Sequence, residues 1–347
     1  MSITRTTDLH PEFKIFRTDV QNSYICITAL VTDSDADPAR MAEVIYDRVA
    51  EILSEAGTQI IHERMFGNVE IHKRLLEVRN QRIRRRFPED PGLVTYIQGD
   101  SCYGNPVSGS QLRGFCPSQD EEGVRIFRDG NNVHGRIWNR KGAKFLQLQS
   151  LYGEILSGGL TRQKQAEEMF LEAETDYAED IFLPASTGIE GKNPGGASTI
   201  MDLLAIVQRS SPEIQVKPLY GIRQRSPYRY GSAFSRAMRV SEPGQNWIFV
   251  SGTASINEKG ETVHIGDLPS QVEQTVEVVN YLIKPEGASF SDLCEATVFL
   301  KKKSDFSLYQ ETAKSLGISD IPAIYLVADV CWEELLFELD AAFVTRQ

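Results

Sequence analysis

The same order of predicted secondary structure occurs twice along the 347 residues, and this repeat constrains the fold more than any other feature. In each copy two strands are followed by an amphipathic helix, a strand, a polar helix and two further β-rich segments. A chain of this length also exceeds the usual size of one hydrophobic core. The duplicated order β-β-α-β-α-β-β therefore predicts an α+β fold of two tandem modules, each a mixed β-sheet backed by helices.

The segments of the two copies correspond one to one. In the first copy the strand pair, helix, strand, polar helix and closing segments are predicted at residues 13–30, 40–56, 59–61, 68–84, 94–98 and 144–148. In the second copy they are predicted at residues 247–256, 269–283, 296–300, 306–316, 323–328 and 335–344.

These positions divide the chain into an N-terminal module at 1–173, an irregular connecting segment at 174–240 and a C-terminal module at 241–347. Gly and Pro interrupt the connecting segment repeatedly, and within it only 198–208 has the pattern of a helix, capped by Ser198 or Thr199. Long irregular segments inside a compact protein are usually functional or mobile. We expect this one to wrap the boundary between the modules.

Composition excludes several classes of function. No apolar run approaches the roughly 18 to 20 residues of a membrane helix, and the first residues lack the apolar core of a signal peptide, so a cytoplasmic protein without a membrane partner is expected. The formal charge of -11 disfavours nucleic acid as a partner. The five cysteines include no CxxC pair and the five histidines are scattered, so neither a disulfide framework, a metal nor another cofactor is implied.

The second half carries motifs of a known family. The stretch 249–256, Gly260 and the run Phe337-Glu338-Leu339-Asp340 resemble the RidA/YjgF family, whose small chorismate-mutase-like α+β modules assemble as trimers with clefts between subunits. The wider chain resembles chorismatases, in which RidA-like modules are fused in one polypeptide. The matching stretches, in chain order, are residues 62–67, 96–99, 183–189, 201–205, 234–237 and 328–331.

The resemblance implies a function. Chorismatases remove the enolpyruvyl group of chorismate and release pyruvate with either a dihydroxycyclohexadiene carboxylate or a hydroxybenzoate. By this resemblance Glu338 is the catalytic acid, and Cys331 matches the position where 3-hydroxybenzoate-forming members carry cysteine. The chain differs from the family in a shortened segment before Leu183 and in arginines missing near 214–216 and 310–311.

The residues themselves are compatible with this chemistry. Cleavage of an enol ether needs a carboxylic acid that keeps its proton near neutral pH, and the apolar neighbours of Glu338 would disfavour its charged form. On a strand, Glu338 and Asp340 share one face while Phe337 and Leu339 point to the other. The alternatives are that the two carboxylates form the solvated face of a strand, and that Cys331 is a small buried apolar residue.

Chorismate is a dianion, and arginine binds both oxygens of a carboxylate. Arg223, Arg225 and Arg236 precede the second module; the alternative for such a cluster is a set of surface salt bridges. Gly252 and Thr253 end a predicted strand at a turn where backbone N–H groups can bind an anion, or the glycine can simply serve the turn. Thr187 lies in a similar Ser-Thr-Gly stretch.

We therefore expect a chorismatase-like enzyme that acts on a small anionic substrate as a monomer or small homo-oligomer. The sequence leaves two alternatives open. One is a RidA-like enzyme acting on another carboxylated, enamine, imine or polyketide-type substrate of secondary metabolism. The other is a non-catalytic protein that binds a small molecule.

Overall fold

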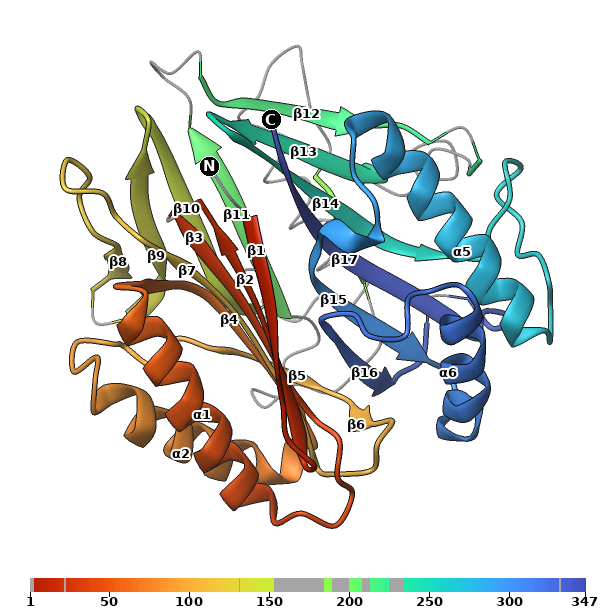
Figure 1. The fold of residues 1–347 in the computed structure, drawn as a ribbon, viewed down its shortest axis with the longest axis horizontal. Helices are drawn as coiled ribbons and strands as arrows, with labels where there is room; N and C mark the ends of the chain where they lie inside the picture. The colour runs from red at the N-terminus through yellow and green to blue at the C-terminus, as the bar shows by residue number, and fades with distance from the viewer. Residues whose placement is uncertain are drawn as a thin grey trace.

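The first module is a six-stranded sheet covered on its outer face by two helices (Figure 1). The computed structural model of the chain describes residues 3–21, 23–130, 132–152, 184–188, 200–207, 213–221, 223–224, 234–330 and 332–347. The sheet order is β1-β2-β3-β7-β4-β5, formed by β1 (Ile3–Leu9), β2 (Phe13–Val20), β3 (Tyr24–Val31), β4 (Gln59–Gly67), β5 (Thr95–Gln98) and β7 (Val107–Phe115). The helices are α1 (Pro38–Glu55) and α2 (His72–Arg84), with a 3-10 turn at Val69–Ile71 before α2.

The second module repeats this arrangement with its own sheet and helices. Its sheet order is β12-β13-β14-β17-β15-β16-β6, formed by β12 (Gln215–Leu219), β13 (Ala237–Glu242), β14 (Gln245–Ala254), β15 (Leu293–Leu300), β16 (Ala323–Val327), β17 (Phe337–Arg346) and the short β6 (Asp100–Ser101). Its helices are α5 (Leu268–Ile283) and α6 (Phe306–Ser315), with 3-10 turns at Lys284–Glu286, Phe290–Asp292 and Lys303–Asp305. The strand β6 comes from the first half of the chain, so the modules are joined through one sheet edge.

The first helix of each module begins in the same way. The side chain of Asp37 accepts a hydrogen bond from the backbone N–H of Arg40 before α1, and that of Asp267 accepts one from Ser270 before α5. A proline stands in the first turn of both helices, where its missing N–H is not needed. The buried faces of these helices close the two outer cores, so the prediction of two similar α+β modules is confirmed.

The strand β7 closes the first module and was missed by the sequence pattern. Residues 144–148, predicted for that place, lie instead in β10 (Ala143–Tyr152) of a third sheet. This sheet has the order β11-β10-β9-β8, with β8 (Arg125–Asp129), β9 (Asn132–Arg140) and β11 (Ile200–Val207). The sequence of β7, Val-Ser-Gly-Ser-Gln-Leu-Arg-Gly-Phe, is largely polar yet almost wholly buried, because the strand lies between β3 and β4.

The helix predicted at residues 198–208 is wrong over its described part. Residues 200–207 form β11, which pairs antiparallel with β10 from Lys144 opposite Val207 to Tyr152 opposite Ile200. A short apolar run fits a helix or a strand equally well by periodicity, and here pairing with a distant strand decides the outcome. β12 and the start of β13 also lie inside the segment expected to be irregular.

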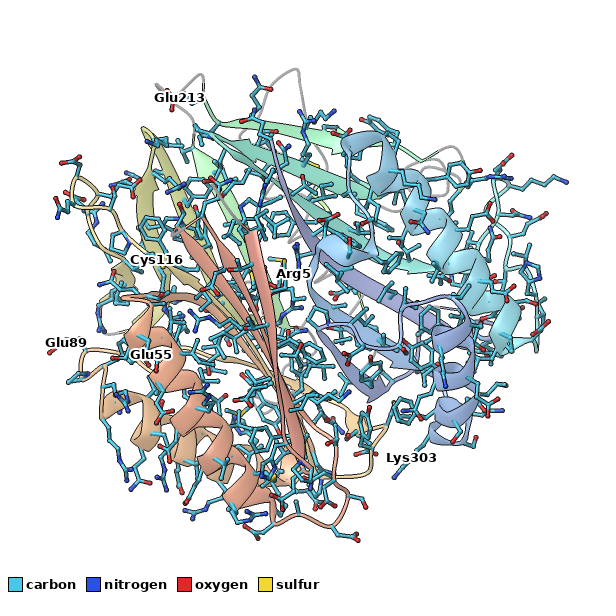
Figure 2. All side chains as sticks on the ribbon, viewed as in Figure 1. Arg5, Glu55, Glu89, Cys116, Glu213 and Lys303 are labelled. Carbon is cyan, nitrogen blue, oxygen red and sulfur yellow. The ribbon has the colours of Figure 1, made fainter. Side chains whose placement is uncertain are left out.

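The two module sheets face each other with their helices on the outside (Figure 1). Polar contacts cross between the facing surfaces. Arg5 of β1, labelled in Figure 2, donates to the carbonyl of Val344 at 3.1 Å. Gln111 of β7 donates to the carbonyl of Ala296 at 2.6 Å. Within the described ranges, no helix is long and apolar enough to cross a membrane.

Candidate active site

Glu338 lies on the face of β17 that is turned away from the helices of its module. Phe337 and Leu339 are buried in the core beneath α5 and α6, as the alternation along the strand predicts. In the sheet Glu338 stands between Ala254 of β14 and Phe299 of β15. Only 5% of the residue is exposed, so the carboxyl is not part of a solvated strand face.

Gly252 makes room for the Glu338 carboxyl. The pairing of β14 with β17 shifts register between Val250 and Thr253, which brings Gly252 against the neighbouring strand. A Cβ atom added to Gly252 would stand 2.1 Å from Oε1 of Glu338 and 3.0 Å from Cγ2 of Thr187. Three residues predicted from the sequence, Thr187, Gly252 and Glu338, therefore meet at one place.

The segment 184–188 is held against β14 by a short series of hydrogen bonds. The N–H of Gly252 donates to the hydroxyl of Thr187 at 2.9 Å, and the N–H of Ser186 donates to the hydroxyl of Ser251 at 2.9 Å. The hydroxyl of Ser251 in turn donates to the carbonyl of Ser235 at 2.5 Å. The N–H expected to hold an anion is thus used by Thr187. Thr253, also predicted to bind substrate, is buried and donates its hydroxyl to the carbonyl of Ser251 at 2.8 Å.

Of the predicted arginines that the structure describes, Arg236 is the one whose charge acts on Glu338. It is buried, its carbonyl accepts a hydrogen bond from the N–H of Ser251 at 2.9 Å, and its guanidinium lies 5.4 Å from the ring centroid of Phe234. Burial and, to a smaller extent, the negative charge of Asp340 raise the pKa of Glu338 to about 8, although the positive charge of Arg236 opposes both. The site thus combines a carboxyl that favours its protonated form with the positive charge of Arg236.

Asp340 is tied to the first module by contacts that no local pattern in the sequence indicates. Its carboxylate accepts a hydrogen bond from the N–H of Thr297 at 3.2 Å and lies 3.6 Å from the guanidinium of Arg64 in β4. Arg64 also pairs with Glu295 at 3.0 Å, and Arg113 of β7 pairs with the same Glu295 carboxylate at 3.2 Å. The three ion pairs join residues of different modules that are 182 to 276 positions apart, so no sequence spacing could indicate them.

Arg223 lies exposed against α5. It donates to the hydroxyl of Tyr281 at 3.0 Å, stacks over that ring at 4.9 Å and pairs with Glu277 at 3.4 Å. These contacts are those of a surface salt bridge, the second interpretation considered for this residue. Arg225 and Cys331, predicted to bind substrate and to shape the product, lie outside the described residues.

A second polar cluster was not recognised from the sequence. His62 of β4 and Asp202 of β11 lie 2.9 Å apart, and Asp202 also accepts hydrogen bonds from the hydroxyl of Thr95 at 2.5 Å and the N–H of Ser150 at 3.0 Å. Burial lowers the pKa of His62, so the neutral ring is favoured. The cluster fastens the third sheet to the first module.

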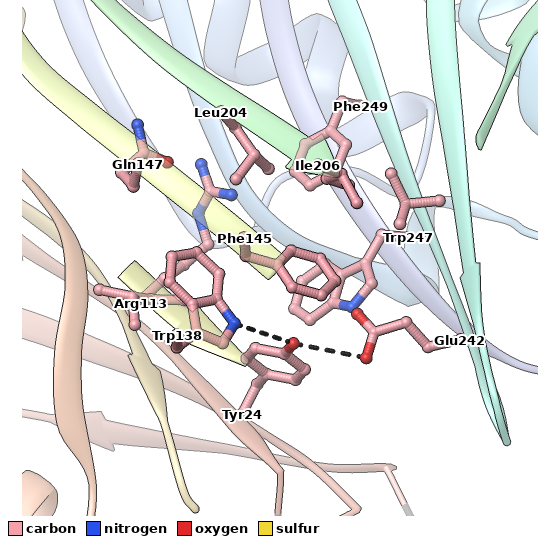
Figure 3. Close-up of a pocket in the computed structure, with 12 residues that line it drawn as sticks. Tyr24, Arg113, Trp138, Phe145, Gln147, Leu204, Ile206, Glu242, Trp247 and Phe249 are labelled. Carbon is pink, nitrogen blue, oxygen red and sulfur yellow. Dashed lines mark hydrogen bonds between the residues drawn. The ribbon is translucent and has the colours of Figure 1, made fainter. Parts of the chain in front are cut away.

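A cavity of about 30 Å³ lies where the three sheets meet (Figure 3). Aromatic residues of all three sheets line it, and the hydroxyl of Tyr24 bridges Trp138 and Glu242 at one side. Ligand pockets are typically of the order of 300–1,000 Å³, so this space suits one or two water molecules and not an organic acid. Glu338 is not among its lining residues.

Comparison with known proteins places the fold in a family. The family model described as Endoribonuclease L-PSP matches residues 229–341. A RutC family protein from Pyrococcus abyssi is 30% identical over 110 residues, which cover 31% of this chain and 83% of that protein. This chain belongs to the RutC family. The matched stretch contains Glu338, Gly252 and Arg236, so this RutC family chain carries its candidate site in the shared module.

Two further likenesses cover larger shares of the chain. A 3-hydroxybenzoate synthase from Streptomyces hygroscopicus is 28% identical to this RutC family protein over 174 residues, 45% of this chain and 49% of that protein. The match thus spans about half the length of that relative. A chorismatase crystal structure superposes with a TM-score of 0.50 at 13% identity, covering 82% of this chain and 92% of that one. The RutC family protein is therefore chorismatase-like in fold and built of RidA-like modules, as the sequence motifs predicted.

Proposed function

We propose that this protein cleaves the enolpyruvyl ether of chorismate, with Glu338 as the proton donor. The observation that carries the proposal is the buried carboxyl of Glu338, whose pKa of about 8 keeps its proton at neutral pH. The likeness to a 3-hydroxybenzoate synthase and to a chorismatase supports the choice of substrate. The tandem RidA-like fold alone would fit many small ligands.

The reaction begins with transfer of the Glu338 proton to the terminal CH₂ carbon of the enol ether. The former double-bond pair forms the new C–H bond, and the ether carbon becomes an oxocarbenium-like centre beside the Glu338 carboxylate. Cleavage of the bond between the ring and the ether oxygen then releases pyruvate, and the ring loses one proton, which restores the acid, as it becomes a hydroxybenzoate. Alternatively, water adds to the oxocarbenium carbon and gives up a proton, and the bond between this carbon and the ether oxygen then breaks to release pyruvate. Chorismate has the atoms of pyruvate plus a hydroxybenzoate, whereas the dihydroxycyclohexadiene product requires one added water.

Arg236 supplies a positive charge beside the acid. A substrate carboxylate that pairs with this guanidinium would neutralise the positive charge that otherwise opposes protonation of Glu338. Binding of an anionic substrate would thus hold the proton on Glu338 until the enol ether accepts it. A neutral substrate would not have this effect.

The first experiment is to mix the purified protein with chorismate, quantify pyruvate and identify the ring product by chromatography and mass. Glu338→Gln keeps the shape and removes the transferable proton, so turnover is expected to fall by about 10² to 10⁴. Glu333→Gln, an exposed glutamate of the preceding turn, is the matched control and should leave turnover unchanged. Turnover retained in Glu338→Gln would contradict the role of the acid.

The pH dependence gives an independent check. Because the protonated form is the active one, turnover is expected to hold below about pH 8 and to fall as the pH rises through it. If both the wild type and Glu338→Gln bind chorismate by calorimetry and neither releases pyruvate, the protein is a binding protein and the proposal fails. If neither binds, another substrate class must be tested.

A further inference from the structure

Asp340 is the nearest charged group to Glu338 on its own strand. Residues two apart on a strand share a face and stand about 7 Å apart. The Asp340 carboxylate cannot easily turn away, because the N–H of Thr297 donates to it at 3.2 Å and Arg64 lies 3.6 Å from it. A negative charge is therefore fixed beside the proposed acid.

The cation that holds Asp340 comes from the other module. Arg64 stands on β4, between Asp340 and Glu295, and Arg113 on β7 binds the same Glu295 carboxylate. Positive and negative groups thus alternate across the facing sheets. Arg64 contacts Asp340, the carboxylate next to Glu338. Of the two carboxylates Asp340 and Glu295, Arg113 contacts Glu295, which is farther from Glu338 along the series.

We propose that Asp340 is a positioning residue for the reaction at Glu338: its negative charge, which Arg64 of the first module partly offsets, keeps the proton on the Glu338 carboxyl. The inference rests on the proposed function for what the proton is used for. The coupling of the charges does not depend on that function. This coupling would give the first module a part in the reaction, although the acid belongs to the second module.

The other groups that surround Glu338 can be named for the part of the chain that the structure describes. Arg236 contributes a positive charge, whereas Gly252 of β14, Phe299 of β15 and Thr187 are neutral. Because Asp340 is the like charge among them, removing it should favour the ionised form of Glu338, and removing Arg64 should favour the protonated form.

The test measures the protonation of Glu338 directly as well as turnover. The infrared band of a protonated carboxyl is followed against pH, and the same titration of Glu338→Gln is subtracted to assign the band. Asp340→Asn is expected to lower the midpoint by about one pH unit, and Arg64→Met to raise it. Turnover of chorismate against pH should show the same two displacements.

Two controls separate coupling from general damage. Arg113→Met removes a cation from the same buried series without touching Asp340 and should leave the midpoint at its wild-type value. Arg64→Lys keeps the positive charge and should also leave the midpoint at its wild-type value. This variant can be measured even if Arg64→Met fails to fold. An Asp340→Asn protein with the wild-type midpoint would overturn the inference. Shifted infrared midpoints without any chorismate turnover would uphold it and reject the proposed substrate.

Discussion

At the scale of single residues, Gly252 and Glu338 form a pair in which the missing side chain of one gives room to the other. An alanine Cβ at position 252 would stand 2.1 Å from Oε1 of Glu338, so the carboxyl would have to move. The displaced atom is the end of a flexible side chain, and the strand itself can stay in place.

Gly252→Ala is therefore expected to reduce kcat/KM for chorismate by about 10², since a displacement near 1 Å of a reacting group has effects of this size. The melting temperature should change little. Steady-state kinetics and thermal unfolding of the same preparation check both statements. A large fall in the melting temperature together with the loss of turnover would show that Gly252 stabilises the strand and does not specifically make room for the acid.

Glu338 could be found from the sequence because the run from Phe337 to Asp340 resembles a family motif, whereas its local pattern of apolar neighbours fits a solvated strand face as well. The placement of Asp340 on the same face follows from the same alternation. Arg64, Glu295 and the pair formed by His62 and Asp202 could not be found in this way. Their contacts exist only after two modules have packed together, and charged residues at ordinary spacing look the same in solvated and in buried positions.

At the scale of elements, β11 shows how distant pairing outweighs local preference. Its apolar run resembled a helix, but Asp202 in its middle accepts hydrogen bonds from β4, β5 and β10 through His62, Thr95 and Ser150. Although burial disfavours its charge, the bond from His62 lowers the pKa of Asp202. The helix order, the outer cores and β17 could be predicted because their apolar periodicity is strong. β7 could not, because its buried face is polar.

Asp202→Ala should destabilise the protein by about 2–4 kcal/mol, because it leaves several buried donors without their acceptor. Unfolding in urea gives the change, and hydrogen exchange should show the loss of protection in β10 and β11 first. Asp8→Ala removes an exposed carboxylate that pairs with Arg48 and should cost less than about 1 kcal/mol. Equal costs for the two variants would mean that β11 is held by its strand pairing and not by Asp202.

At the scale of the whole molecule, the two modules have the same strand order but different chemistry at equivalent positions. In the second sheet Glu338 lies opposite Phe299, and Phe299 lies opposite Leu326. At the equivalent positions of the first sheet, Gly109 lies opposite Phe66, and Phe66 lies opposite Ile97. Gly109 thus stands where the second module has its acid. A Cβ at Gly109 would lie 2.1 Å from the carbonyl oxygen of Ala29 and 2.7 Å from Cδ1 of Ile324.

The duplicated fold should therefore bind one substrate per chain, not two. Ile324 of the second module fills the space that an acid of the first would need, and Gly109 cannot supply a proton. Calorimetric titration of the Glu338→Gln protein with chorismate, which that variant should bind without consuming, is expected to give a stoichiometry of one per chain. Two equivalent sites would show that binding does not depend on the acid-bearing face, because only one module carries a carboxyl there.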